Sequence, residues 1–530
     1  MEFPVLDDAK MILRYALGLR RFLERPLTPE ECRQALEHQL KTREESFLRI
    51  LERGIFAHPR SPYRRLFARA GIGYEEVAKG VRSDGMEATL GRLYNEGVYV
   101  TYEEFKGRRP IERPGLFLPT RAGDFDNPLL AKHYEARTGG SRGVGTRIIV
   151  DFDLLTHEAA YFHFFLTAFD LVGRPMGMWH PLPPAVAGMK QALRYAKLGE
   201  SMDKWFSNSS LRLRPGAVKY FVFTSYAIYG SKFLGRPLPV PEYVPPTKAS
   251  RVAEWLAAKK EKGTPAVLLT NPSSAVRVCS AASENGVDIS GTFFRLGGEP
   301  YTPAKARIVA ETGSQAACHY SMAEMGEIGV PCASPVALDD VHVVSDKLAV
   351  IQRDKLPGNS GVGVGALFYT TLLSSCPKLM INVESDDYGA LVKRDCGCPF
   401  GSLGFDQHLH GIRSYDKLTS EGMTFLGGEL ITLVEEILPA RFGGHPTDYQ
   451  FVEEEEGGLT KISVVVSPRV GPVDGEDVVR TVLEVLRSYP GAKKTMADLW
   501  REGSTLRVVR REPYATGAAK ILPLHILHKR

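Results

Sequence analysis

The sequence predicts an α/β fold: a large N-terminal domain of mixed and parallel sheets flanked by helices, plus a small mobile C-terminal α+β domain. One observation is the alternation of patterns after residue 250, with helices expected at 250–262 and 273–284 and buried strands at 265–269 and 292–296. Such alternation predicts a largely parallel sheet with ligands at the strand ends. The other is a change after about residue 412, where a helix, a hairpin, a helix and a strand follow in turn.

The chain length of 530 residues exceeds the size at which one hydrophobic core usually keeps growing, so at least two domains are expected. The predicted division is a large N-terminal domain at 1–412 with a helical extension at 1–55, a hinge at 413–416, and a small lid domain at 417–530.

Local signals predict the remaining elements in order. Near the N-terminus, a helix is expected at 7–23, and Thr28-Pro29-Glu30-Glu31 has the spacing of a capping box that opens a second helix to about Leu51. A strand at 147–152, a helix at 157–170 and a surface loop over the five prolines of 235–247 follow. The small domain should contain a helix at 429–438, a hairpin at 448–454 and 459–467, a helix at 477–488 and a strand at 506–510.

The composition and charge of the chain argue against nucleic-acid binding and membrane association. The net charge of +5 is small for this length and no basic patch stands out, so nucleic-acid binding is not expected. We also expect no membrane association, because no apolar run has the length of a bilayer span and the N-terminus lacks the pattern of a signal peptide. Seven cysteines in so long a chain do not form a disulfide framework, which predicts a cytoplasmic protein, as a monomer or homodimer.

The loop at 138–146 is rich in glycine and hydroxyl side chains and predicts a phosphate-binding site. Glycines let the backbone approach a phosphate, and N–H and hydroxyl groups then donate to its oxygens. The alternative is a surface loop. Residues 139–143 also match the G-x-S-x-G nucleophile elbow, but that elbow needs a helix after the serine and a strand pattern follows here.

Three further polar clusters lie downstream in a fixed order: Tyr320-Ser321-Met322-Ala323-Glu324, Ser385-Asp386-Asp387 and Thr516-Gly517-Ala518-Ala519-Lys520. A phosphate loop, an acidic metal position, a ribose-binding acid and a late lysine are the parts needed to adenylate a carboxylic acid. A lysine on a small mobile domain can be delivered for adenylation and withdrawn afterwards. Alone, Lys520 would be read as a solvent-facing lysine of the tail.

With Pro272-Ser273, Gly297–Pro300, Asp387-Tyr388-Gly389 and 413–416, these motifs resemble the adenylate-forming superfamily of acyl-CoA synthetases, peptide-synthetase adenylation domains and luciferases. The similarity is greatest to the phenylacetate–CoA ligase-like branch and covers about residues 60–530 in order and spacing.

The resemblance implies a role for each motif residue. It gives Lys520 and Glu324 catalytic roles, with Mg²⁺ on Glu324, a ribose-binding role to Asp387 and a hinge role to Asp416. It assigns ATP or AMP binding to Thr138, Gly140, Ser141, Gly143, Thr146, Gly298, Glu299, Pro300, Tyr320, Ser321 and Arg413.

The chain departs from the family pattern at several positions. Ala323 replaces the usual Thr or Ser before the metal-binding glutamate, which removes a hydroxyl and puts the metal geometry in doubt. Ala518-Ala519 replaces the usual Ser-Gly before the lysine, and Val144-Gly145 replaces the proline and lysine of the loop.

The resemblance implies activation of a carboxylic acid by ATP through an acyl-adenylate, with pyrophosphate released and the acyl group passed to CoA. An amine acceptor, which would give an amide, is the alternative, because 422–428 replaces the Gly-x-Asn-Val-Phe-Pro run of the CoA-ligase branch. A non-catalytic descendant that binds an adenylate is a second alternative, motivated by Ala323. The expected cofactors are ATP and Mg²⁺, with CoA as co-substrate.

Four residues predict a structural Zn²⁺ site: Cys332, His342, Cys396 and Cys398. Three thiolates and one imidazole suit tetrahedral zinc, and some phenylacetate–CoA ligase-like proteins are similar here. The alternative is a set of buried reduced cysteines with a core histidine.

An aromatic cluster at 219–234 hints at a pocket for an aryl acid, with Tyr220, Phe223, Tyr226 and Met322 as candidate lining residues. Aromatic residues at this spacing also suit a plain hydrophobic core.

Overall fold

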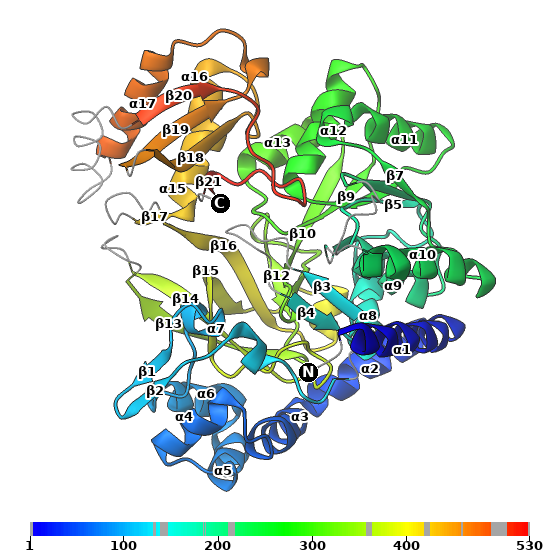
Figure 1. Ribbon diagram of the computed structural model, residues 1–530. Coiled ribbons are helices and arrows are strands. Elements are labelled where there is room, and N and C mark those ends of the chain that lie inside the picture. The colour runs from blue at the N-terminus through cyan, green and yellow to red at the C-terminus, as the bar shows by residue number, and fades with distance from the viewer. Residues whose placement is uncertain are drawn as a thin grey trace.

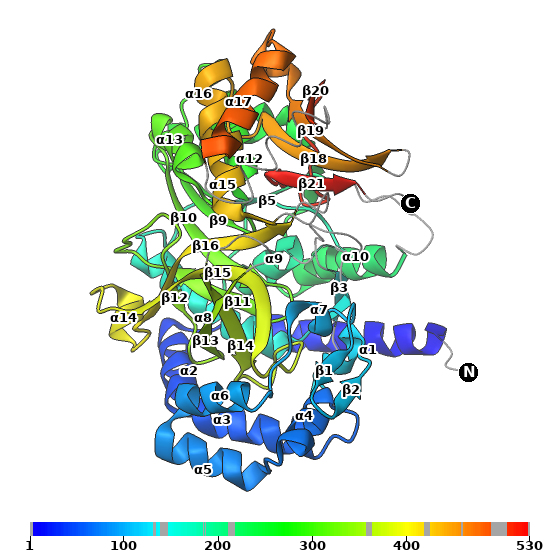
Figure 2. The same cartoon turned by 90° about the vertical axis from the view of Figure 1, so that its left-hand side faces the viewer.

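Helices make up most of the N-terminal region in the computed structural model, which describes residues 4–527 except 131–133, 138–146, 184, 186, 210–217, 357–362, 418–423, 457–458 and 489–505. The helices are α1 (Pro4–Glu24), α2 (Pro29–Lys41), α3 (Arg43–Ile50), α4 (Pro62–Ala70), α5 (Tyr74–Asp84) and α6 (Met86–Asn95). In Figures 1 and 2 this region and the small C-terminal sheet lie at opposite ends of the molecule.

The capping box predicted at Thr28 is confirmed. The Thr28 hydroxyl accepts from Glu31 N at 3.2 Å, and Thr28 N donates to the Glu31 carboxylate at 2.9 Å. The helix ends at Lys41 rather than near Leu51, because Thr42 leaves the helical conformation (φ −103°, ψ 14°) before α3 begins.

One large sheet organises the molecule (Figure 1). Its strands run in the order β13 (Leu348–Lys355), β14 (Val364–Thr371), β15 (Val383–Lys393), β16 (Gln407–Lys417), β12 (Val341–Val343), β11 (Gly326–Pro331), β10 (Gln315–Met322), β9 (Phe293–Gly297), β8 (Val267–Thr270), β5 (Met176–Trp179), β6 (Lys204–Ser207) and β7 (Pro241–Tyr243), with β17 (Thr424–Leu426) on β16. From β10 to β7 all neighbours are parallel, and from β10 to β13 all are antiparallel. The sheet therefore changes character at β10.

The parallel half carries the helices α8 (Phe152–Ala168), α9 (Ala187–Lys197), α10 (Val218–Phe233), α11 (Ser250–Glu261), α12 (Pro272–Glu284) and α13 (Pro303–Glu311), of which α8, α11 and α12 were expected. The predicted alternation of helices and strands after residue 250 is confirmed. The prediction of a plain loop at 235–247 is wrong in part, because β7 lies within it. Pro241 is tolerated there because β7 is the edge strand of the sheet.

The small C-terminal sheet has the order β20 (Leu506–Arg510), β19 (Leu459–Val466), β18 (Tyr449–Glu456), β21 (Leu524–Leu527). Helices α15 (Gly427–Thr432), α16 (Leu438–Phe442) and α17 (Gly475–Ser488) and a π-helical turn at Leu433–Ile437 join it, and together they form a separate hydrophobic core. The hairpin and the long helix predicted here are confirmed.

The predicted hinge at 413–416 falls within the last residues of β16. Strand β16 continues to Lys417, and Asp416 stands opposite Phe425 of β17. Residues 413–416 are therefore strand in this arrangement, and the hinge and domain boundaries stay predictions.

A two-stranded hairpin flanks the predicted phosphate loop. Strands β3 (Tyr134–Arg137) and β4 (Arg147–Val150) pair antiparallel, with Arg137 opposite Arg147. The loop at 138–146 itself lies outside the described residues. The strand that follows it removes the helix that a nucleophile elbow requires. Among the helices that the structure describes, none combines the length and apolarity that a bilayer span requires.

Candidate functional site

The carboxyl ends of the parallel strands bring the predicted motifs to one edge of the sheet. Asn271 follows β8, Gly298 follows β9, Glu324 follows β10 and His180 follows β5. Ligands of open α/β sheets bind at this edge. The last predicted part, Lys520, comes to the same edge from the C-terminal tail.

The tail segment 511–523 leaves β20 of the small sheet and reaches the large domain before it returns to β21 (Figure 1). Asn271 Nδ2 donates to Ala518 O at 2.9 Å, and Arg277 Nη1 donates to Ala519 O at 3.1 Å. These contacts hold the two carbonyl groups that precede Lys520 in the chain. Ala519 has a φ of +60°, a left-handed conformation that favours glycine, the residue usual at this position in the family.

Lys520 extends to Gly298. Gly298 has a φ of +85°, which favours glycine, and a Cβ atom there would lie 2.6 Å from Lys520 Nζ and displace the ammonium. Burial lowers the pKa of the Lys520 ammonium, and the nearby Glu299 carboxylate offsets part of this. The ammonium therefore lies in a partly desolvated position, where its electrostatic attraction to an incoming anion is stronger than it would be in water.

Glu299 is anchored by the start of α12. Its Oε1 accepts from Ser273 N at 2.8 Å and its Oε2 accepts from Ser273 Oγ at 2.7 Å. Both residues are buried. This carboxylate fixes the turn that carries Gly298, and its role beside an adenine, like that of Pro300, stays a prediction.

Asp387 lies at the centre of a hydroxyl network. Its Oδ2 accepts from Tyr320 OH at 2.6 Å, and its other oxygen accepts from Ser414 Oγ, in register across β15 and β16. Burial, and then the Asp387 charge, raise the pKa of Tyr320 well above its usual value. The hydrogen bond from Tyr320 supports Asp387, rather than the neighbouring Asp386, as the predicted acid. Arg413, one residue before Ser414, pairs with Asp339 at 3.0 Å.

Glu324, in the turn between β10 and β11, is engaged by a residue that the sequence reasoning missed. Lys106 Nζ donates to Glu324 Oε1 at 2.5 Å, and the two side chains are 14% and 6% exposed. Lys106 belongs to no motif and lies 218 residues away, so spacing offered no signal. Ala323, the residue before Glu324, has no side-chain oxygen to add beside this pair.

Two imidazoles, on His180 and His319, complete the edge. Burial, and then Lys520, lower the pKa of His180 to about 3, while burial and Arg295 lower the pKa of His319 well below its usual value. Both rings are therefore neutral near pH 7. A Cβ atom at Gly297 would lie 2.2 Å from the His319 ring, which explains that glycine.

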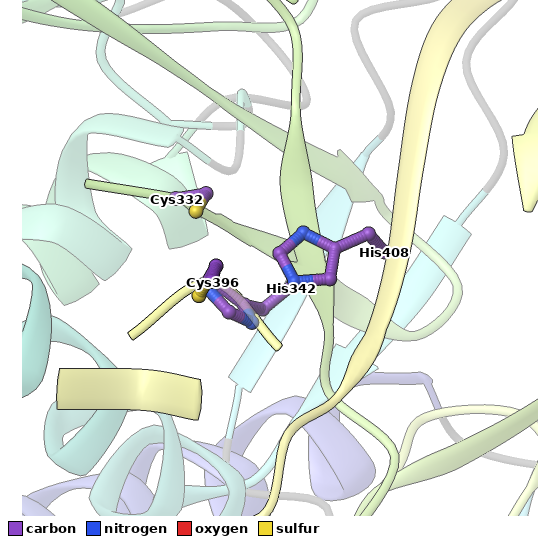
Figure 3. Close-up of side chains that lie close together, drawn as sticks. All are labelled: Cys332, His342, Cys396 and His408. Atoms are coloured by element: carbon purple, nitrogen blue, oxygen red, sulfur yellow. The ribbon is translucent and has the colours of Figure 1, made fainter. Parts of the chain in front are cut away.

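A cluster of sulfur and nitrogen atoms occupies the antiparallel half of the sheet. One ligand atom each from Cys332, His342, Cys396 and His408 lies within 4.8 Å of the others (Figure 3). Cys398 Sγ lies 3.0 Å from His342 Nε2. The four residues predicted for zinc thus come together, with His408 as a fifth candidate donor that the sequence reasoning missed.

The geometry of the cluster suits a metal. His342 Nδ1 lies 2.7 Å from Phe405 O and His408 Nδ1 lies 2.9 Å from Asp340 Oδ1, so both rings are oriented by second partners, as metal-binding imidazoles usually are. His408 Nε2 is buried without a hydrogen-bond partner. The hydrogen bond with Cys332, and then His342, lower the pKa of Cys398, which favours a thiolate. Thiolates and imidazoles are the donors that zinc prefers.

No family model matches the chain. No curated protein matches it in sequence. A solved structure of 2-hydroxyisobutyryl-CoA ligase, in the postadenylation state with R3-HIB-AMP, aligns with a TM-score of 0.51 and 16% identity over 91% of this chain and 88% of the other. The chain has the fold of an adenylate-forming ligase. The expected fold class is confirmed, and the phenylacetate–CoA ligase-like branch stays a prediction.

Two further ligase structures align less closely. The same 2-hydroxyisobutyryl-CoA ligase, with 2-HIB-AMP and CoA in the thioesterification state, aligns with a TM-score of 0.43 and 16% identity over 95% of this chain and 91% of the other. ATP-bound MatB from Rhodopseudomonas palustris aligns with a TM-score of 0.41 and 13% identity over 76% and 68%.

Within this ligase fold, two of the aromatic residues predicted to line an acid pocket contact helix α1. Phe223 is buried edge-on against Tyr15 of α1, at a ring separation of 4.9 Å, and Tyr226 is 42% exposed beside the same ring. Tyr226 is thus a surface residue where α10 meets α1 and Phe223 is a core residue there, and their roles in an acid pocket stay predictions. Met322 ends β10 and packs against the main core. The side chains of Tyr220 and Asp416 lie outside the described set, as do Thr138, Gly140, Ser141, Gly143 and Thr146.

Proposed function

We propose that this protein is an ATP-dependent ligase that activates a carboxylic acid as an acyl-adenylate, releases pyrophosphate and then passes the acyl group to CoA. The observation that carries the proposal is the delivery of Lys520 from the small domain to Gly298, at the carboxyl ends of the parallel strands. A binding protein has no need of a half-buried tail lysine at that edge.

Charge explains why a lysine is wanted there. When a carboxylate attacks the α-phosphate of ATP, two anionic groups approach each other and negative charge concentrates on the phosphate oxygens. A preorganised ammonium in a site shielded from water stabilises that charge more strongly than solvent does. Lys520 supplies it, and the neutral His180 and His319 add no second charge to compete for the anion.

The nucleotide would lie between Gly298 and Asp387. Asp387 presents a carboxylate already surrounded by hydroxyls, which suits the two hydroxyls of a ribose. The loop at 138–146 would bind the phosphates, as its composition predicts. The resemblance also assigns Mg²⁺ to Glu324, but the donors described there do not fit a preformed Mg²⁺ site, because Lys106 holds the carboxylate and Ala323 adds no oxygen.

The first test measures ATP–pyrophosphate exchange over a panel of acids. Lys520→Ala should abolish exchange, a loss of about 100-fold or more, the size of effect that removal of one charge-stabilising donor produces elsewhere, while ATP binding and the melting temperature stay close to wild type. Lys262→Ala, at an exposed position after α11, is the matched control. Exchange by Lys520→Ala near the wild-type rate would refute the assignment, and no exchange with any acid while ATP still binds would favour a non-catalytic binder.

The second test identifies the acceptor. CoA or candidate amines are added to the acid and ATP, and AMP release is followed together with the product. A thioester formed only when CoA is present supports the proposal. An amide formed without CoA would instead establish an amide synthetase.

We also propose that the Cys332 cluster holds a structural Zn²⁺. Cys332, His342 and Cys396 would be ligands in either arrangement, with Cys398 or His408 as the fourth. The ion would fix the strands of the antiparallel half, and no chemical step passes through it.

A further inference from the structure

The N-terminal region enters the nucleotide edge through one short segment, residues 100–106. Val100 N donates to Asn382 O at 3.1 Å, and Glu384 N donates to Val100 O at 2.8 Å, so this segment continues as a short parallel partner of β15. Glu384 lies three residues before Asp387. The segment is thereby tied to the strand that carries the proposed ribose acid.

The segment then turns toward Glu324. Thr101 caps the short helix α7 (Tyr102–Phe105) in a capping box with Glu104, and Glu104 is in turn fixed by Arg113 at 2.8 Å. This rigid turn places Lys106 at its end. The Lys106 ammonium lies 5.4 Å from the centre of the Tyr102 ring and 2.5 Å from Glu324 Oε1. Lys106 is therefore held at the Glu324 carboxylate by its own backbone and by its neighbours.

We infer that Lys106 occupies, at Glu324, the place that a divalent cation bound to ATP would take, and that Lys106 and this cation compete for the carboxylate. The inference rests on the proposed function, since it concerns the Mg²⁺ that accompanies ATP as substrate. It makes Lys106 a positioning residue of the nucleotide site and links the N-terminal region to nucleotide binding.

Two physical arguments support competition. An ammonium and a dication at one nearly buried carboxylate repel each other strongly in a medium of low dielectric constant. The carboxylate therefore cannot bind both cations tightly at the same time. Mg²⁺ also demands close to octahedral oxygen coordination at short distances. Lys106 covers one oxygen of Glu324, and Ala323 provides no hydroxyl to compensate. Direct coordination of Mg²⁺ by Glu324 therefore requires Lys106 to move.

The experiment measures ATP binding by titration calorimetry at fixed ATP while Mg²⁺ is varied. Lys106→Met keeps the aliphatic stem and removes the charge. It should lower the Mg²⁺ concentration at half-maximal ATP binding by about tenfold, which corresponds to about 1.4 kcal/mol. Lys106→Arg keeps the charge and should stay near wild type, and Lys79→Met, at an exposed position on α5, is the matched control.

A second variant keeps the test decisive if Lys106→Met folds poorly. In a Glu324→Gln background the carboxylate charge is gone, so adding Lys106→Gln should leave the Mg²⁺ dependence unchanged, whereas Lys106→Gln alone should shift it. An unchanged or higher Mg²⁺ requirement in Lys106→Met overturns the inference, and so does loss of ATP binding at every Mg²⁺ concentration, which would mean that Lys106 contacts the nucleotide itself. Wild-type protein that shows neither Mg²⁺-promoted ATP binding nor exchange would instead overturn the proposed function.

Discussion

At the scale of single residues, the Lys520 ammonium lies near two neutral imidazoles. Lys520 is held by backbone contacts of Ala518 and Ala519 rather than by a carboxylate within hydrogen-bonding distance in the described contacts. His180 and His319 are kept neutral by burial and by neighbouring positive charge. The ammonium is thus poised for a ligand that brings its own negative charge.

The lowered pKa of Lys520 predicts the alkaline limit of adenylation. Only the protonated amine can neutralise the phosphate, so the rate should fall as the pH rises through the Lys520 pKa, which burial moves below the ordinary 10.5. Pyrophosphate exchange measured against pH should show this alkaline limb. In Lys520→Arg, whose guanidinium stays protonated, whatever activity remains should persist to higher pH. An identical limb in both proteins would assign the titration to another group.

At the scale of elements, one buried ion pair joins the two sheets. Lys305 of α13 lies 2.8 Å from Glu435 of the π-helical turn in the small domain, and Thr302 Oγ1 donates to the same carboxylate at 2.5 Å. Burial opposes the charge on Lys305, but Glu435 outweighs it, and the pKa of Lys305 is raised. This pair holds the small domain in the arrangement that presents Lys520.

Breaking that pair on one side should weaken the docking of the small domain. Lys305→Met leaves the buried Glu435 carboxylate without its cation, with only the Thr302 hydroxyl donating to it among the described residues, a loss of about 3–5 kcal/mol for a buried pair. Pyrophosphate exchange should fall, and hydrogen exchange at 515–521 should speed up. The double variant Lys305→Met/Glu435→Leu should recover part of the loss, because no charge is stranded. Equal rates of hydrogen exchange at 515–521 in Lys305→Met and wild type would show that the pair does not govern docking.

Local patterns predicted the helices and strands at 250–296 and the hairpin and long helix of the small domain, but not the strands β10–β16 of the large sheet. The capping box at Thr28 and the alternation after residue 250 depend on neighbours in sequence, so a single chain carries their signal. The proximity of Lys106 to Glu324 and of His408 to His342 depends on which strands pair, which spacing does not reveal. The contact of Tyr226 with α1 gave no sequence signal for the same reason, since α1 lies about 200 residues earlier.

At the scale of the whole molecule, three distant parts of the chain meet at the strand where the sheet changes from parallel to antiparallel. The N-terminal segment brings Lys106, β10 leads to Glu324, and the tail brings Lys520. The antiparallel half supplies Asp387 and Ser414 through β15 and β16. The proposed nucleotide site therefore depends on the rigidity of β15 and β16, and the Cys332 cluster lies near the other ends of these two strands.

That dependence predicts the consequence of removing a metal. Purified protein should contain about one Zn²⁺ per chain, and a strong chelator should lower the melting temperature by roughly 5 °C, because several kcal/mol of coordination would be lost. ATP binding should weaken as well, since β16 carries both His408 and Ser414. His408→Asn and Cys398→Ser should differ in zinc content and so identify the fourth ligand, with His410→Asn, on the same strand, as the matched control. Protein that contains no zinc, and whose melting temperature does not change when Zn²⁺ is added, would show that these thiols and imidazoles are only a packed core.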